Sequence, residues 1–201
     1  MALTNYTTLQ AAIKSALHRS DLDSAIVDFI ALAEDKLNKR LRLRAMETRA
    51  TSSVSTEYAA LPTGFLAIRN IQLNTDPKVR LEYVTPDYID KNYAKGSTGE
   101  PKFYTIVGGE IQFAPIPDTS YTVEISYFKK LDIATDSTNW VLTNAPRVYY
   151  YGSLMEAAAY MKNDKRIPVW STLFENAINE LETSDRGDKY QLGGGLQMRS
   201  A

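Results

Sequence analysis

The fold is decided by the stretch FYTIVGGEIQF, residues 103–113, which predicts a β-hairpin in the middle of the chain. Gly108 and Gly109 separate two apolar-rich segments, and a pair of glycines tolerates the positive φ angles that a tight hairpin turn requires. A further strand is predicted at 121–127, where apolar and polar side chains alternate. We therefore expect an antiparallel sheet with one buried face and one face in solvent.

The β-rich region extends beyond this hairpin in both directions. Between Met46 and Val54, threonine, serine and valine replace the helix-forming residues that precede them, which favours a strand. The other predicted elements are strands at 68–73 and 79–83 and a brief helix from Thr85-Pro86-Asp87 to Tyr93. The sequence thus predicts a β-rich region over residues 46–140.

Two amphipathic helices precede this region. The first covers residues 5–18, with Thr4 or Asn5 as its N-cap, and the second is capped by Asp21 or Asp23. The second helix keeps one apolar face over about 22 residues, or roughly 33 Å of axis. Its apolar positions are Leu22, Ala25, Ile26, Phe29, Ile30, Ala33, Leu37 and Leu41.

Helices return in the C-terminal third. Thr143 or Asn144 is predicted to cap a helix over 147–163 with Pro146 in its first turn, and a last amphipathic helix starts at Asp164. Residues 187–201 have no periodicity and include three consecutive glycines, so they are predicted to form a flexible tail.

The order of elements predicts an α+β fold. We expect a mainly helical four-helix core, formed by residues 1–45 together with 141–186, because the two helical segments must meet in space. The antiparallel β subdomain of residues 46–140 is inserted between them, and residues 187–201 follow as an extended C-terminal tail.

The composition excludes several classes of function. The chain has 201 residues, with 23 basic and 24 acidic side chains and a formal net charge of -1, so no global field attracts it to nucleic acid or to an anionic membrane. It has no cysteine and a single histidine, His18, which rules out thiol catalysis and cysteine or multi-histidine metal sites. We expect no cofactor, no metal and no membrane segment, in a chain made in a reducing cytoplasm.

Residues that could carry chemistry have simpler explanations. His18 ends the first helix, where an imidazole can cap carbonyl groups. Asp21 and Asp23 resemble the start of a calcium loop, but Ile26 occupies the position that requires glycine, so helix capping is the better interpretation. The acidic pairs Glu34-Asp35 and Glu180 with Glu182 are predicted to lie on solvated helix faces rather than across a glycosidase cleft.

A band of basic residues lies at the end of the second helix, with two interpretations open. Cations at the C-terminal end of a helix are favoured by the helix dipole. Alternatively, the band meets an acidic partner or passing DNA phosphates. Its members are Lys36, Lys39, Arg40, Arg42 and Arg44.

Three consecutive tyrosines, Tyr149, Tyr150 and Tyr151, lie on a helix that is apolar nearly all round. At about 100° per residue they span about 200° of its circumference, so they cannot all face one core. Either the helix is central within its own subunit, or the tyrosines form a subunit interface, where aromatic residues are enriched.

Several motifs together resemble the head-to-tail adaptor proteins of tailed bacteriophages, and they cover nearly the whole chain in order. They are residues 28–34, residues 41–50, Leu61-Pro62-x-x-Phe65-Leu66, the hairpin of residues 104–109, and Asn139-Trp140-x-Leu142 ahead of Ala145-Pro146.

The resemblance implies a passive assembly role. Adaptor subunits form a ring, usually twelvefold, under the portal, extend the DNA channel and present a platform for later tail components. In related adaptors the C-terminal segment is ordered against the portal, and residues 187–201 fit this role because a short segment can order on binding. The predicted portal contacts are Arg186, Lys189, Tyr190, Leu192, Leu196, Met198 and Arg199.

We therefore expect a non-enzymatic adaptor in the neck of the virion, assembled in the host cytoplasm. Its expected partners are other copies of itself, the portal protein, a downstream neck or tail protein, and packaged DNA that passes without sequence-specific contact. The alternatives are another neck component, such as a tail terminator or stopper, and a cell-wall glycan hydrolase, for which the sequence offers no support.

Overall fold

The computed structural model describes residues 3–19, 21–162 and 165–193. The chain divides into two compact units: a helical unit of Met1–Ala45 and Leu131–Ala201, and a β unit of Met46–Lys130. Helices and strands therefore occupy separate parts of the chain, which confirms the predicted α+β class. The second boundary lies ten residues before the predicted one, because residues 131–140 pack with the helices.

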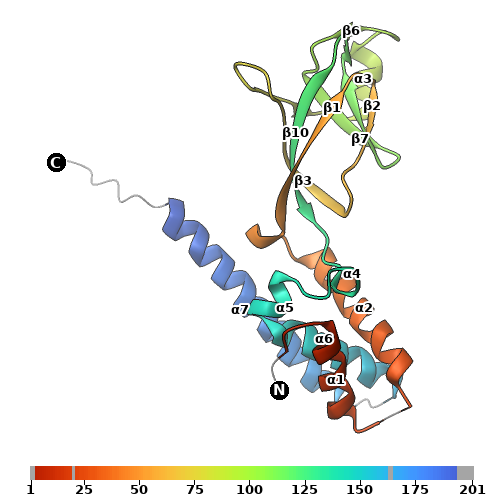
Figure 1. Ribbon diagram of the computed structural model, residues 1–201, viewed down its shortest axis with the longest axis vertical. Helices are drawn as coiled ribbons and strands as arrows, with labels where there is room; N and C mark the ends of the chain where they lie inside the picture. The colour runs from red at the N-terminus through yellow and green to blue at the C-terminus, as the bar shows by residue number, and fades with distance from the viewer. Residues whose placement is uncertain (1–2, 20, 163–164, 194–201) are drawn as a thin grey trace, which may run out of the picture. The chain divides into compact units, whose positions relative to one another are not determined.

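Among its described residues, the helical unit has four long helices, two short ones and a 3-10 turn. Figure 1 shows their arrangement. Helix α6 is central, since α1, α2, α5 and α7 all pack against it. Gly152 on α6 permits a close approach, because a Cβ there would lie 2.9 Å from the Phe174 ring of α7 and 3.1 Å from Ala33 of α2. The elements are α1 (Tyr6–Leu17), α2 (Asp23–Arg40), η1 (Arg44–Met46), α4 (Ile133–Asp136), α5 (Trp140–Asn144), α6 (Pro146–Tyr160) and α7 (Ile167–Gly193).

Of the N-caps predicted for the first two helices, that of α1 is correct and that of α2 is wrong. The Asn5 side chain caps α1 by accepting a hydrogen bond from the Thr8 backbone N–H. The Thr8 side chain accepts one from the Asn5 backbone N–H, which completes a capping box. Helix α2 instead follows Leu22 and has no side-chain cap. The two aspartates predicted for this role are ion-paired elsewhere, Asp21 with Arg19 and Asp23 with Lys14, each at 2.6 Å.

The start of the C-terminal helices also differs from the prediction. Thr143 and Asn144, one of which was predicted to cap the helix over 147–163, lie instead inside the short helix α5, and α6 follows Ala145 with no side-chain cap. Helix α5 is capped by Asn139, whose side chain accepts a hydrogen bond from the Leu142 backbone N–H. The chain then breaks at Ala145 and restarts with Pro146 as the first residue of α6. The break has a steric cause, because the residue before a proline is disfavoured in the α conformation.

Helix α7 is longer than the sequence predicted. It continues to Gly193, so residues 187–193, which the sequence assigned to a flexible tail, are helical. One glycine within a helix costs only about 1 kcal/mol relative to alanine, and residues 188–192 contain no proline. The helix therefore passes through Gly187 without ending.

The β unit has two four-stranded sheets, ordered β1-β10-β3-β4 and β2-β8-β7-β5, and a two-stranded sheet of β6 and β9. The hairpin of β7 and β8 confirms its prediction, with Gly108 and Gly109 at φ 62° and 86°. The strands are β1 (Glu47–Val54), β2 (Tyr58–Ala60), β3 (Phe65–Leu73), β4 (Val79–Arg80), β5 (Glu82–Tyr83), β6 (Thr98–Gly99), β7 (Phe103–Val107), β8 (Glu110–Ala114), β9 (Ile116–Pro117) and β10 (Tyr121–Lys129).

Two short pairings depart from the purely antiparallel sheet that was predicted. Strand β5 pairs with β7, and β6 with β9, in parallel. Parallel neighbours need a crossover connection, and the chain between β5 and β7 contains the brief helix α3 (Pro86–Asn92), which begins with Pro86 after Thr85 as predicted.

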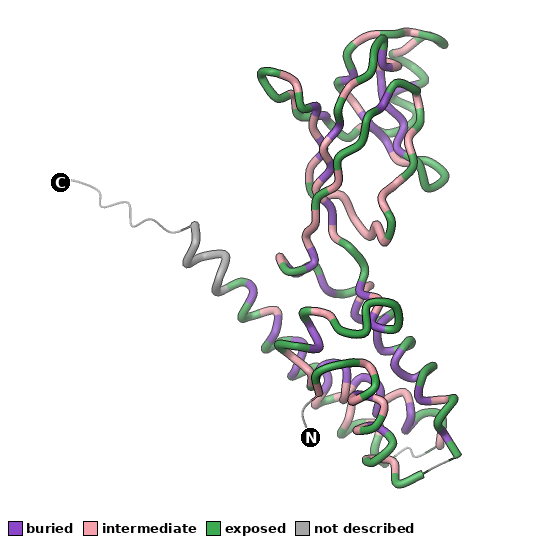
Figure 2. The backbone as a smooth tube through the Cα atoms, in the orientation of Figure 1, coloured by how far each residue is buried: buried purple, intermediate pink, exposed green. Residues whose placement is uncertain are grey.

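The core of the β unit is formed by buried residues of both four-stranded sheets. Figure 2 marks buried residues along the backbone in purple. Leu73, Val123 and Ile125 from one sheet join Tyr104, Ile111 and Phe113 from the other. Leu81 is also buried there, at the point where the chain passes from β4 in one sheet to β5 in the other. The alternation of buried residues along β10 follows the predicted pattern.

Candidate interaction surfaces

The three tyrosines of α6 have different surroundings. Tyr149 is fully buried within the helical unit, so it is not available for a subunit interface and that part of the prediction is wrong. Tyr150 and Tyr151 are half-buried, with ring centroids 5.5 Å apart. Successive helical residues diverge by about 100°, and the structure turns the first of the three inward and leaves the other two near the surface.

Tyr149 belongs to a buried polar network that the sequence did not reveal. Its hydroxyl donates to Glu34 Oε1 at 2.6 Å and accepts from Asn139 Nδ2 at 2.6 Å. The backbone N–H of Ile133 also donates to Glu34 Oε1, at 2.9 Å. Burial raises the pKa of the Tyr149 phenol far above its usual value, and the Glu34 carboxylate raises it further. The network links α2, α4, α6 and the cap of α5.

Tyr150 and Tyr151 extend into an aromatic surface with α7. The Tyr151 ring stacks on Trp170 with centroids 6.0 Å apart, and the neighbouring Val169 is 54% exposed. We call Tyr150, Tyr151, Val169 and Trp170 the aromatic surface. Large apolar side chains that remain accessible together are typical of the places where proteins associate.

Four of the five cations of the basic band pair with carboxylates, and Arg42 contacts backbone carbonyls. Lys36 pairs with Glu156 of α6, Lys39 with Asp35 one turn away, and Arg44 with Asp185 of α7. Arg42 donates to the carbonyl oxygens of Asn38 and Leu41, which are the C-terminal carbonyls that the dipole explanation expected a cation to meet.

Arg40 is the most connected member of the band. Its guanidinium contacts Glu175 at 2.5 Å, Glu182 at 3.1 Å and the Asn179 side chain at 3.0 Å, all on α7. Hydrogen bonding to Glu175 raises the pKa of Arg40. Four of the five cations of the band are thus engaged within the helical unit, by the carboxylates of Asp35, Glu156, Glu175, Glu182 and Asp185.

The acids considered for glycoside hydrolysis are engaged in structural contacts. Glu34 is buried in the Tyr149 network, Asp35 pairs with Lys39, Glu180 pairs with Arg147 at 3.4 Å, and Glu182 pairs with Arg40. All four acids were predicted to lie on solvated helix faces, and Glu34 is the one of them that is buried. No pair of these carboxylates forms the two-sided site that the reaction requires.

Four of the seven predicted portal contacts lie near the end of α7. Arg186 is exposed, and Lys189, Tyr190 and Leu192 belong to the last turns of the helix, where the backbone is described. Leu196, Met198 and Arg199 lie outside the described residues. The last described ion pair of α7 is that of Asp185 with Arg44. The helix continues for eight residues beyond Asp185, or about 12 Å.

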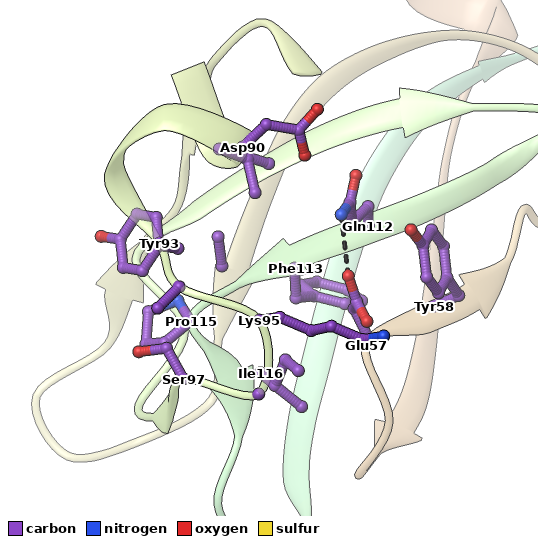
Figure 3. A pocket seen from close by; sticks show the side chains of 14 residues that line it. Glu57, Tyr58, Asp90, Tyr93, Lys95, Ser97, Gln112, Phe113, Pro115 and Ile116 are labelled. Carbon is purple, nitrogen blue, oxygen red and sulfur yellow. Dashed lines mark hydrogen bonds between the residues drawn. The ribbon is translucent and has the colours of Figure 1, made fainter. Parts of the chain in front are cut away.

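Two concave surfaces were not predicted. In the helical unit, a groove of about 580 Å³ lies between the start of α6 and α7, with Trp140 (43% exposed) on its wall. In the β unit, a pocket of about 330 Å³ lies between α3, its following loop, and strands β2 and β8 (Figure 3). Sequence pattern could not find either, because each combines segments that are distant along the chain.

Within the part of the chain that the structure describes, no group of three or more His, Asp or Glu side chains is placed to hold a metal ion. Among the same residues no helix combines the length and apolar character needed to cross a membrane. His18 occupies the C-cap of α1 in a left-handed conformation, with φ 52°.

Comparison with known protein families matches residues 4–199 to the SU10 adaptor proteins. The chain belongs to this family. The match covers nearly the full length and both units, so it confirms the resemblance to phage head-to-tail adaptors that the sequence motifs indicated. A search among curated proteins finds no match.

Family membership gives the surfaces described above a context. A phage adaptor is a component of the virion and associates with other proteins of the phage head or tail. Its accessible aromatic residues, grooves and helix ends are therefore candidates for protein contacts.

Proposed function

We propose that this adaptor is a non-enzymatic structural protein that forms a ring under the portal, extends the DNA channel and provides the platform for tail attachment. The observation that carries the proposal is the family match over residues 4–199 in a chain whose candidate catalytic carboxylates are engaged in structural contacts. The proposed ring has twelve subunits, and DNA passes through it without sequence-specific contact.

The aromatic surface is the proposed lateral contact between subunits. Tyr150, Tyr151 and Trp170 are held by one another in the single chain, so few side-chain rotamers are lost when a neighbour covers them. Val169 adds an exposed apolar group at the edge of this surface. A contact repeated around a ring needs only modest strength at each copy.

The end of α7 is the proposed portal contact. Arg40 and Arg44 fix the helix against α2 as far as Asp185, and the eight residues beyond supply a preformed helical segment. A helix that exists before binding loses less conformational entropy on docking than an unfolded tail. Arg186 and Lys189 against Asp188 give these eight residues a net charge of +1, and Arg199 raises that of residues 186–201 to +2, which suits an acidic partner surface.

The test is co-assembly with the portal protein of the same phage, followed by mass photometry and electron microscopy. The full chain should form a ring bound to the portal. A chain ending at Arg186 should lose portal binding while retaining its helical unit, and a chain ending at Gly193 should separate the contribution of the helix from that of the last eight residues. Portal binding by the shortest chain at full strength would contradict the assignment.

A second arm tests the lateral contact. Tyr151→Ser together with Val169→Ser should reduce ring formation without changing the helix content. The matched control is Tyr83→Ser with Val107→Ser in the β unit, which makes the same two substitutions at exposed positions away from the aromatic surface. Equal ring formation by all three proteins would contradict this interface. A ring that binds a tail tube but never the portal would support the terminator alternative.

A further inference from the structure

The pocket of the β unit contains a carboxylate that is held in place by an almost buried amide. Gln112 lies in the middle of β8 between β2 and β7, is 7% exposed, and donates from Nε2 to Glu57 Oε1 at 2.8 Å (Figure 3). Glu57 precedes β2 and is only half-buried. A glutamine amide in the centre of a sheet loses its hydration, which is unfavourable unless the amide is hydrogen-bonded. The bond from Gln112 to Glu57 meets this need and holds the Glu57 carboxylate at the pocket wall.

An aromatic ring forms another wall of the pocket. Tyr58 lies opposite Gln112 in the β2–β8 ladder and is 43% exposed. Burial raises the pKa of the Tyr58 phenol, and the charges of Glu57, Asp90 and Glu110 raise it further. The π face of a tyrosine attracts cations, and nearby carboxylates strengthen that attraction.

The charges around the pocket are not balanced by its own residues. Glu57 and Asp90 line it together with one cation, Lys95, so the lining has a net charge of -1. Among the described residues neither carboxylate forms an ion pair within 4.0 Å. Figure 3 shows the Lys95 side chain lying along the pocket from the loop after α3. Lys95 is exposed and its long side chain can move away.

We propose that this pocket binds an arginine side chain presented by a partner protein. The planar guanidinium stacks on the Tyr58 ring and donates to Glu57, while Asp90 adds charge at the rim. Arginine fits better than lysine because it both stacks on aromatic rings and donates in a plane to carboxylates. A phosphate or another anion is repelled by the same carboxylates. The proposal goes beyond the ring and portal contacts and does not depend on them.

The test is an NMR titration of the full chain with N-acetylarginine N-methylamide as the probe. The amide signals of Tyr58, Ser97 and Gln112 should shift together, with weak saturable binding that declines as salt is added. The neutral isostere N-acetylcitrulline N-methylamide should leave these signals in place. Equal shifts with the citrulline derivative or the lysine derivative, or shifts located elsewhere, would overturn the proposal.

Three variants extend this test, because they are expected to change the affinity for the arginine probe in opposite directions. Glu57→Gln should weaken binding of the arginine probe about tenfold, the value expected for loss of one charge-assisted hydrogen bond. Lys95→Ala should strengthen it, since it removes the competing cation. Tyr58→Leu should weaken it while keeping an apolar wall. The matched control is Glu100→Gln, which changes an exposed carboxylate that does not line the pocket. Unchanged affinity in Glu57→Gln would overturn the assignment.

Discussion

The helical unit and the β unit treat their buried polar groups differently. In the helical unit, Glu34 and Asp185 are bonded to residues of other helices, through Tyr149 and Arg44. In the β unit, Gln112 turns to Glu57 at an open pocket, and Thr105, opposite it in the ladder, has a buried hydroxyl with no hydrogen-bond partner among the described residues.

The difference shows which polar contacts hold each unit in one arrangement and which polar groups remain accessible for binding. A buried polar group is costly unless it is paired, so the polar contacts of the helical unit select one arrangement of its helices. The β unit obtains its arrangement from alternating apolar strands around Phe113. Its polar residues are thus free to shape a surface, which is where we place the arginine pocket.

The largest effect should come from emptying the β core. Phe113→Ala removes a ring that is 1% exposed, and the expected loss of stability is about 3–5 kcal/mol. Hydrogen exchange should increase in β3, β8 and β10 while α2 and α6 keep their protection. The exposed Val107→Ala on the same hairpin serves as the control. Equal loss of protection in both units would show that the two do not unfold separately.

The next effect concerns the polar network of the helical unit. Tyr149→Phe leaves Glu34 and Asn139 each short of one hydrogen bond, and should cost about 1–3 kcal/mol in chemical denaturation. Tyr160→Phe, in a side chain that is 63% exposed, should change stability by less than about 0.5 kcal/mol. If the two variants behave alike, the network does not stabilise the helices.

Close packing around α6 can be broken by a single methyl group. Gly152→Ala places a Cβ against Phe174 and Ala33, and should cost about 1–2 kcal/mol although alanine is the better helix former. Ala159→Ser, at an exposed position of the same helix, provides the comparison. A more stable Gly152→Ala protein would mean that α2 and α7 can move apart without loss.

The ion pairs of Arg40 should have a smaller effect. The side chain is 34% exposed, so Arg40→Gln should cost only about 0.5–1 kcal/mol at low salt, and less in 1 M NaCl. Exchange should rise mainly in α7 after Glu175. Lys39→Gln, which breaks a more exposed pair, should have little effect. A cost that does not respond to salt would assign the role of Arg40 to packing.

The smallest effect is a local titration in the β unit. The Asp118 carboxylate accepts a 2.7 Å bond from Tyr121 and raises the pKa of that phenol to about 12 from 10.0. This bond contributes fully below pH 10 and is lost as the pH rises through about 12, because the folded state holds the proton more tightly. Absorbance titration of Asp118→Asn should show a Tyr121 pKa near its ordinary value; an unchanged value would exclude Asp118 as the cause.

Features that depend on neighbouring residues were predictable from the sequence. The glycines of the β7–β8 hairpin, the Asn5 cap and the Pro86 start of α3 were found because each is set by a few adjacent side chains. The failures are also local in form. Asp21 and Asp23 have the chemistry of caps, but nearby cations compete for them, and pattern alone cannot decide such a competition.

The candidate surfaces were less predictable. Glu34 looks like one half of a solvated acidic pair, and its partner Tyr149 is 115 residues away. Arg40 looks like part of a free basic band, and its partner Glu182 is 142 residues away. The only hint was the apolar character of the residues around Tyr149, which left a central helix open as an alternative.

Periodicity, turn chemistry and motif order are all carried along the chain, so the amino-acid sequence was enough to predict the α+β class, the order of the elements and the adaptor family. The folded structure was needed to see which tyrosine is buried, which cations pair with carboxylates, and that Glu57, Tyr58 and Asp90 line one pocket. Those outcomes depend on contacts between residues that are distant in sequence, and their energies are set by burial and geometry that exist only once the chain has folded.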